Sequence, residues 1–200
     1  DGSTTFTDVK GISWSGFGSA QIDTAQFKFG SSSLYIPANG GIQNSVDNAS
    51  WALGTGNFTI EFFVRLNAAP ASFGIIFDSR VWSNETKPTV YVDSSRRLNY
   101  YVSGSAVITT SATLTLSTWY HVAVVRNAGT TTLYINGTSA GTWTDSTNYT
   151  NQRMGWGDST YSPGSPINGW LDDCRITKGV ARYTANFTPP ALPDLTAARP

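Results

Sequence analysis

Two segments of the sequence combine aromatic rings with charged side chains over a short stretch. Sugar rings stack their C–H faces on tryptophan or tyrosine, and their hydroxyls bond to aspartate, asparagine or arginine. Residues 78–85 and 154–164 have this composition, and both read as loops between strands. The candidate glycan-binding residues are Asp78, Arg80 and Trp82 in the first segment and Trp156, Asp158 and Tyr161 in the second. For each aromatic residue, packing within the protein or against a neighbouring subunit is at least as good an explanation.

Carboxylates that could hydrolyse a glycan are sparse. Glycosidases place two carboxyl groups about 5 to 9.5 Å apart. The glutamates are Glu61 and Glu85, in separate segments, and the adjacent Asp172 and Asp173 are expected on opposite faces of a strand. The single histidine, His121, lies inside a strand pattern and is interpreted as structural. These features predict a protein that is not an enzyme.

Composition excludes further classes of function. The chain has 200 residues with 13 basic and 13 acidic side chains, so no positive field favours nucleic acid. Its one cysteine, Cys174, excludes an internal disulfide, and no apolar run is long enough to span a membrane. Polarity comes mostly from Ser, Thr, Gly and Asn, which gives a neutral, hydrogen-bonding surface.

Alternating apolar residues predict strands along the whole chain. Residues 58–66 alternate, and residues 119–126 are followed by two more runs that Asn136-Gly137 separates, which is a strong hairpin signal. Residues 89–93 and 98–102 form a second expected hairpin. Many short strands without helices between them indicate an all-β, antiparallel two-sheet β-sandwich. We expect one domain over residues 1–188 and a Pro/Ala-rich tail or linker over residues 189–200.

The last strand runs from Trp170 to Thr177. Strict alternation would place Trp170, Asp172, Cys174 and Ile176 on one face and Leu171, Asp173, Arg175 and Thr177 on the other. The strand ends at Gly179, after which the chain continues through Asn-Phe-Thr-Pro-Pro.

Four segments in order resemble a laminin-G-like domain of the concanavalin A-like lectin/glucanase superfamily. They are the opening Asp1–Asp8, the pair 25–30 and 33–36, the motif 54–62, and Trp119–Arg126, with the Asp-Asp strand near the end. The closest resemblance is to the variant found in bacteriophage tail and other virion proteins. It implies a concanavalin A-like jelly roll and a non-catalytic protein of the virion or extracellular surface.

The resemblance implies binding of host cell-surface glycan, as in a tail fibre or receptor-binding module. The alternative is a capsid or tail decoration module that acts through protein–protein contacts with other virion proteins, and a glycan-degrading enzyme is the least favoured reading. Either main role predicts a homo-oligomer or a place in a larger assembly, with neither nucleic acid nor membrane as partner.

The superfamily often holds one Ca²⁺, and hard cations require several oxygen ligands. Asp1 and Asp8 in the opening segment, with Asp173 (or Asp172) from the last strand, are the expected ligands because first and last strands of a sandwich are often neighbours. The alternative is that Asp8 forms an Asx-turn and Asp173 pairs with Arg175 or Lys178.

One departure from the family concerns the start of the sandwich. The family usually has an apolar strand directly before the Asp-Gly pair, which here is Asp1-Gly2. We therefore expect a strand upstream of Asp1, or one supplied by another chain, and a sheet edge that pairs with a neighbour in its absence.

Overall fold

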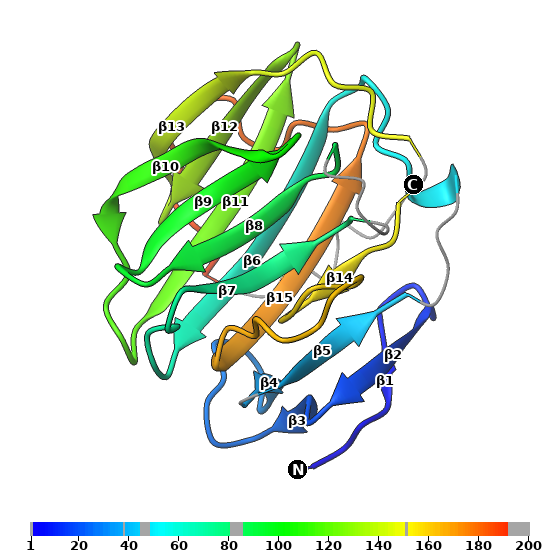
Figure 1. Cartoon of the computed structure of the whole chain (residues 1–200), viewed down its shortest axis with the longest axis vertical. Helices are drawn as coiled ribbons and strands as arrows, with labels where there is room; N and C mark the ends of the chain where they lie inside the picture. The colour runs from blue at the N-terminus through cyan, green and yellow to red at the C-terminus, as the bar shows by residue number, and fades with distance from the viewer. Residues whose placement is uncertain (1, 38, 45–48, 81–85, 151, 192–200) are drawn as a thin grey trace.

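Two antiparallel β-sheets pack face to face (Figure 1). The structure is a computed structural model that describes residues 2–37, 39–44, 49–80, 86–150 and 152–191. The eight-stranded sheet has the order β1 (Phe6–Thr7), β2 (Ser13–Gly18), β5 (Gly40–Gln43), β14 (Gly155–Trp156), β7 (Phe73–Asp78), β8 (Thr89–Asp93), β9 (Arg97–Val102) and β10 (Ser105–Thr113). The seven-stranded sheet has the order β13 (Thr138–Thr144), β12 (Thr130–Ile135), β11 (Trp119–Asn127), β6 (Phe58–Leu66), β15 (Gly169–Lys178), β4 (Ser33–Ile36) and β3 (Gln21–Asp23).

The predicted all-β sandwich is confirmed. The helical content of the described residues is one short 3₁₀ turn, η1 (Ala49–Trp51), and none of their helices is long and apolar enough to cross a membrane. Asn136 and Gly137 have φ angles of 48° and 77°, the left-handed conformation that the predicted β12–β13 turn requires.

The core lies between the sheets and follows the alternation of the central strands. Phe58, Ile60 and Phe62 of β6 are fully buried on its inner face. Val90 and Val92 of β8 are fully buried on the opposing sheet. Burial of an apolar side chain of this size stabilises the fold by about 1.5–3 kcal/mol, so these two strands anchor the sandwich.

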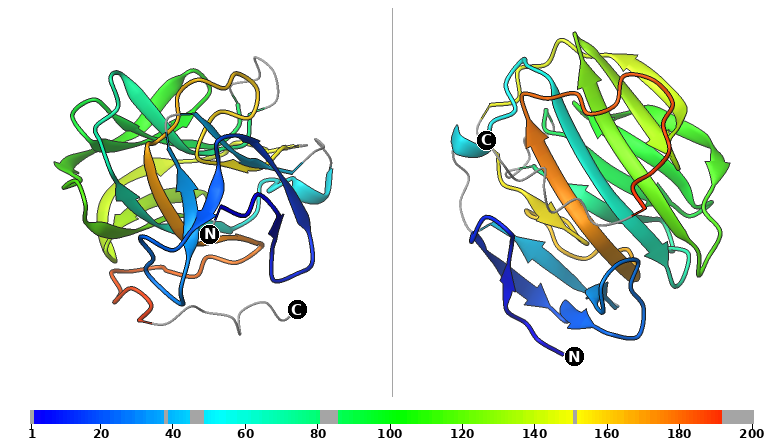
Figure 2. Two further views of the ribbon diagram at one scale, coloured as in Figure 1. Left: turned by 90° about the horizontal axis from the view of Figure 1, so that it is seen from below. Right: turned by 180° about the vertical axis from the view of Figure 1, so that it is seen from behind.

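The chain after β15 crosses the outer face of the seven-stranded sheet as an irregular strap, residues 179–191 (Figure 2, right). Tyr183 stacks on Phe187 with ring centroids 3.5 Å apart. Phe187 also contacts the rings of His121 and Tyr134, at 5.6 and 5.4 Å. This face of β6, β11 and β12 is therefore covered. Residues 192–200 of the expected tail lie outside the described residues.

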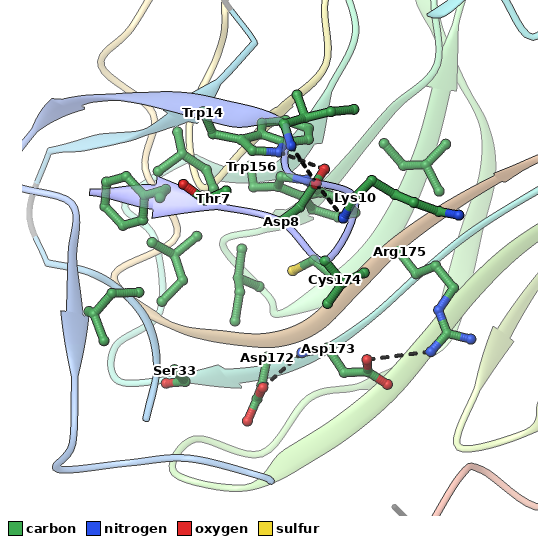
Figure 3. A pocket seen from close by; sticks show the side chains of 18 of the residues that line it. Thr7, Asp8, Lys10, Trp14, Ser33, Trp156, Asp172, Asp173, Cys174 and Arg175 are labelled. Atoms are coloured by element: carbon green, nitrogen blue, oxygen red, sulfur yellow. Dashed lines mark hydrogen bonds and ion pairs between the residues drawn. The ribbon is translucent and has the colours of Figure 1, made fainter. Parts of the chain in front are cut away.

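A β-bulge interrupts β15 at its two aspartates. Asp172 pairs with Phe63 and Arg175 with Glu61, so three steps along β15 match two along β6. Asp173 has a φ of 44°, in the left-handed region. The bulge turns Cys174 inward, whereas Asp172 and Asp173 both point away from the cavity (Figure 3). The strict alternation expected for this strand therefore holds through Asp172 and is wrong from Asp173 onward.

Truncation of the aromatic contact between Tyr183 and Phe187 in the strap should cause a measurable loss of stability. Phe187→Ala removes the stack on Tyr183 and should lower the free energy of unfolding by about 1–3 kcal/mol. Urea denaturation followed by tryptophan fluorescence measures this. Val180→Ala in the same strap, at 51 % exposed, is the control and should change stability by less than about 0.5 kcal/mol. Equal effects would contradict a packed strap.

Candidate functional site

Trp156 lies in the core, not on a loop surface. It is 3 % exposed, in the two-residue strand β14 between β5 and β7. Its ring contacts Phe77 and Phe62, with centroids 4.9 and 5.7 Å away. The backbone of Gly41 on β5 passes so close that a Cβ there would clash with the Trp156 carbonyl oxygen. In this position the indole cannot offer its face to a sugar.

Asp158 and Asp78 are buried and act on their own loops. The carboxylate of Asp158 accepts hydrogen bonds from the backbone N–H groups of Gly164 and Ser165, both at 2.9 Å, which closes the loop after β14. Asp78, at the end of β7, accepts from Thr89 Oγ1 at 3.0 Å and from Ser159 Oγ at 2.9 Å. Both aspartates are about 1 % exposed or less. Their carboxylates therefore hold the surrounding loops in place and are not accessible to a ligand.

Arg80 and Tyr161 do meet at the surface. Arg80 Nε donates to Asp78 Oδ1 at 2.8 Å, and its guanidinium lies over the ring of Tyr161 at 5.1 Å and over that of Tyr101 at 5.7 Å. Burial alone would lower the pKa of Arg80, but the bond and charge of Asp78 outweigh it and raise that pKa. Arg80 is thus a fixed cation beside two aromatic rings. Trp82 lies outside the described residues.

The rings continue across the outer face of the eight-stranded sheet. Tyr101 of β9 contacts Tyr91 of β8 at 6.3 Å, and Tyr91 contacts Phe73 of β7 at 5.8 Å. Phe73 is 43 % exposed and Tyr161 38 %. We call Phe73, Tyr91, Tyr101, Arg80 and Tyr161 the aromatic row. Sequence reasoning missed its three strand residues, although Val90 and Val92 facing the core already place Tyr91 on the opposite face.

Two of the three expected calcium ligands, Asp8 and Asp173, are bonded to other groups of the protein. Both Asp8 oxygens accept N–H donors, Oδ1 from Lys10 and Ile12 at 2.9 Å and Oδ2 from the Trp14 indole at 3.2 Å. Asp173 pairs with Arg175 at 3.5 Å. Both arrangements match the structural alternative. No group of three His, Cys, Asp or Glu suited to a metal occurs in the part of the chain that the structure describes, and Asp1 lies outside it.

Glu61 is the centre of a buried polar cluster beneath the strap. Its carboxylate is ion-paired with Arg182 at 2.8 Å, accepts a hydrogen bond from the Tyr183 hydroxyl at 2.7 Å and lies 3.3 Å from His121 Nε2. Burial by itself raises the pKa of Glu61, but the bonds to His121 and Tyr183 and the charges of Arg182 and Arg175 hold it below its ordinary value. A carboxylate so engaged is ionised and inaccessible, unlike a general acid.

The family follows from the sequence match over this sandwich. A model of the Laminin_G_3 family matches residues 38–182, most of the chain. The chain belongs to the concanavalin A-like lectin/glucanases superfamily. No curated protein matches this member of the superfamily at the sequence level.

Solved structures share the sandwich of this superfamily member at low identity. Domain 4 of the extracellular arabinanase AbnA from Geobacillus stearothermophilus, in complex with arabinotriose, has a TM-score of 0.58 and 16 % identity over 90 % of this chain and 82 % of its own. A putative carbohydrate-binding protein from Bacteroides ovatus has a TM-score of 0.55 and 15 % identity over 74 % of this chain and 45 % of its own.

Trypanosoma rangeli sialidase also matches, with a TM-score of 0.61 and 13 % identity over 89 % of this chain. The lectin-like chain covers 29 % of the sialidase, so it corresponds to one part of that enzyme. At such identities these likenesses show the fold alone.

Truncation of Trp156 and truncation of Tyr161 should affect stability to different extents. Trp156→Ala removes a core ring and should lower the free energy of unfolding by about 3–5 kcal/mol. Tyr161→Ala, at a surface position, should change it by less than about 1 kcal/mol. Urea denaturation of both variants checks the assignment, and a stable Trp156→Ala variant would contradict it.

The Glu61 cluster predicts part of the acid sensitivity of the fold. Because the folded-state pKa is lowered, the ionised carboxylate stabilises the protein above the unfolded pKa, about 4.3, and this contribution is lost as pH falls through the folded value. Glu61→Gln should therefore be less stable than the native protein at pH 7 and approach it at pH 3. Urea denaturation at pH 7, 5 and 3 measures this, and parallel pH profiles would refute it.

Proposed function

We propose that the chain is a non-catalytic carbohydrate-binding domain of a virion or extracellular surface protein, and that it binds glycan on the aromatic row. The observation that carries the proposal is a fixed guanidinium between two tyrosine rings, Arg80 between Tyr101 and Tyr161, on an open sheet face. Rings beside a hydrogen-bond donor are what a sugar face and its hydroxyls require.

Several features support this assignment. The superfamily includes lectins, and the structurally similar domain 4 of AbnA is described in complex with arabinotriose. The chain has no net charge, which suits a neutral glycan better than a polyanion. Non-catalytic status is supported by the carboxylates near the row, because Asp78 and Asp158 are buried and saturated with hydrogen bonds.

The contribution of the aromatic row to glycan affinity can be measured with variants. Glycan-array screening followed by titration calorimetry, with arabinotriose as the first soluble probe, gives the affinity. Tyr101→Ala and Tyr161→Ala should each weaken binding at least about tenfold, or about 1.4 kcal/mol. Arg80→Lys should weaken it as well, because lysine keeps the charge but loses the planar fork.

The matched control is Phe27→Ala, an exposed ring at 44 % in the connection between β3 and β4. It should leave affinity unchanged. Native affinity in all three row variants would refute the row as the site. Release of reducing sugar from a bound glycan would refute the non-catalytic assignment.

A further inference from the structure

Five residues in register form a line across the outer face of the seven-stranded sheet. Gln21 of β3 pairs with Tyr35 of β4, which pairs with Trp170 of β15. Trp170 pairs in turn with Arg65 of β6, and Arg65 with Trp119 of β11. The residues that follow each of these along its strand pack on the core, so the five side chains belong to the opposite, outer face.

The indole of Trp170 has Tyr35 on one side in this line and Arg65 on the other. The rings of Tyr35 and Trp170 are stacked, with centroids 4.8 Å apart and 20° between their planes. The guanidinium carbon of Arg65 lies over the Trp170 ring, 5.2 Å from its centroid. Trp170 Nε1 donates to Asp23 Oδ2 at 2.6 Å, which fixes the indole. Arg65 is therefore held against a ring that is itself held in place.

Arg65 has no carboxylate partner within the part of the chain that the structure describes. Over those residues its side chain makes no hydrogen bond or ion pair, and its contact is the ring of Trp170. Arg65 is also partly exposed, so its N–H donors are available to a ligand. By contrast, several other arginines are paired with carboxylates, namely Arg80, Arg97, Arg126, Arg175 and Arg182.

A second cation lies near Arg65 on the same face. The exposed Lys28 places its Nζ 5.4 Å from the centroid of the Phe63 ring. Phe63 and Arg65 are alternate residues of β6, so they share a face and lie roughly 6.6 Å apart along the strand. The carboxylates of this region are already bonded, Asp23 to the indole and Asp172 to the backbone N–H of Lys28 at 2.7 Å. The face therefore offers two cations to an anionic ligand.

The strap meets β6 towards the other end of that strand. Thr59 Oγ1 donates to the carbonyl oxygen of Val180 at 3.0 Å, and the Tyr183 hydroxyl donates to Glu61. Arg65 is the penultimate residue of β6, beside the start of β15. It stays partly exposed with the strap in position.

The backbone around Arg65 favours a saccharide over a peptide strand as ligand. At Trp170, β15 is paired with β4 on one side and β6 on the other, and at Arg65, β6 is paired with β15 and β11. A peptide therefore gains no main-chain hydrogen bonds there. Recognition depends on a charged group for the guanidinium and an apolar face for the half-exposed rings of Tyr35 and Trp119, which a sugar with an acidic group supplies.

We propose that Arg65, with Lys28 beside it, binds the carboxylate of a uronic acid residue in an acidic glycan. The planar guanidinium matches a carboxylate through two parallel N–H···O bonds. The site is distinct from the aromatic row, which lies on the other sheet. It is also distinct from the cavity of about 630 Å³ between β15 and the β1–β2 hairpin (Figure 3). It does not depend on glycan binding at the row.

Titration calorimetry with trigalacturonic acid tests the charge of the ligand. We expect the acid to bind at least about tenfold more tightly than its methyl ester, which keeps the sugar rings but removes the charges. Its affinity should fall as ionic strength rises, because the cations are solvent-exposed. Equal affinity of the two forms, or no measurable binding of the acid, would overturn the proposal.

Variants locate the site. Arg65→Gln should weaken trigalacturonate binding at least about tenfold, and Arg65→Lys by a smaller factor, because lysine keeps the charge but loses the planar fork. The control Arg97→Gln removes the same charge from the outer face of the other sheet and should leave the affinity unchanged. Circular dichroism melting verifies folding. Native affinity in Arg65→Gln would overturn the proposal, and the comparison of acid and ester on the native chain decides it should that variant unfold.

A hexaglutamate peptide distinguishes a sugar from an acidic peptide as the source of the carboxylate. Trigalacturonate should bind more tightly than the peptide, because the peptide lacks a sugar ring to place against Tyr35 and Trp119. Tighter binding of hexaglutamate, lost in Arg65→Gln, would overturn the assignment to a glycan in favour of an acidic polypeptide.

Discussion

The β-bulge at Asp172–Asp173 is the constraint on which both faces of the seven-stranded sheet depend. One extra residue in β15 reverses the alternation, so that Cys174 and Ile176 face the core while Arg175 reaches Glu61 on the outer face. Without the bulge, strict alternation would carry Arg175 to the apolar side, where an isolated charge is costly. The bulge therefore lets one strand serve an apolar cavity wall and a charged outer cluster at once.

That outer cluster explains why the strap has a fixed path. Glu61 is surrounded by groups from three parts of the chain: His121 from β11, Arg175 from β15, and Arg182 and Tyr183 from the strap. A buried carboxylate left without these partners would be strongly destabilising, so the strap and the sheet specify each other. The strap therefore covers this face of the seven-stranded sheet with Tyr183 and Phe187.

Alternation and turn chemistry were enough to predict the sandwich, because strands such as β6 and the Asn136-Gly137 hairpin carry strong local signals. The residues of the candidate site were harder to predict from the sequence. Trp156 sits in a two-residue strand, too short for any periodicity to reveal that it enters the core. Asp78 resembles a ligand-binding carboxylate in sequence, but its role depends on Ser159, which only the fold brings beside it. The bulge in β15 likewise leaves no mark in the order of residues, since Asp173 could occupy either face of a regular strand.

The aromatic row and the strap lie on the outer faces of different sheets. The row belongs to β7, β8, β9 and the loop after β14, whereas the strap packs on β6, β11 and β12. Asp78 connects the row to the loop after β14, because its carboxylate accepts hydrogen bonds from both Arg80 and Ser159. The position of the Arg80 guanidinium beside Tyr101 and Tyr161 is therefore set by contacts of the eight-stranded sheet and its loops, and it does not depend on the Glu61 cluster of the other sheet.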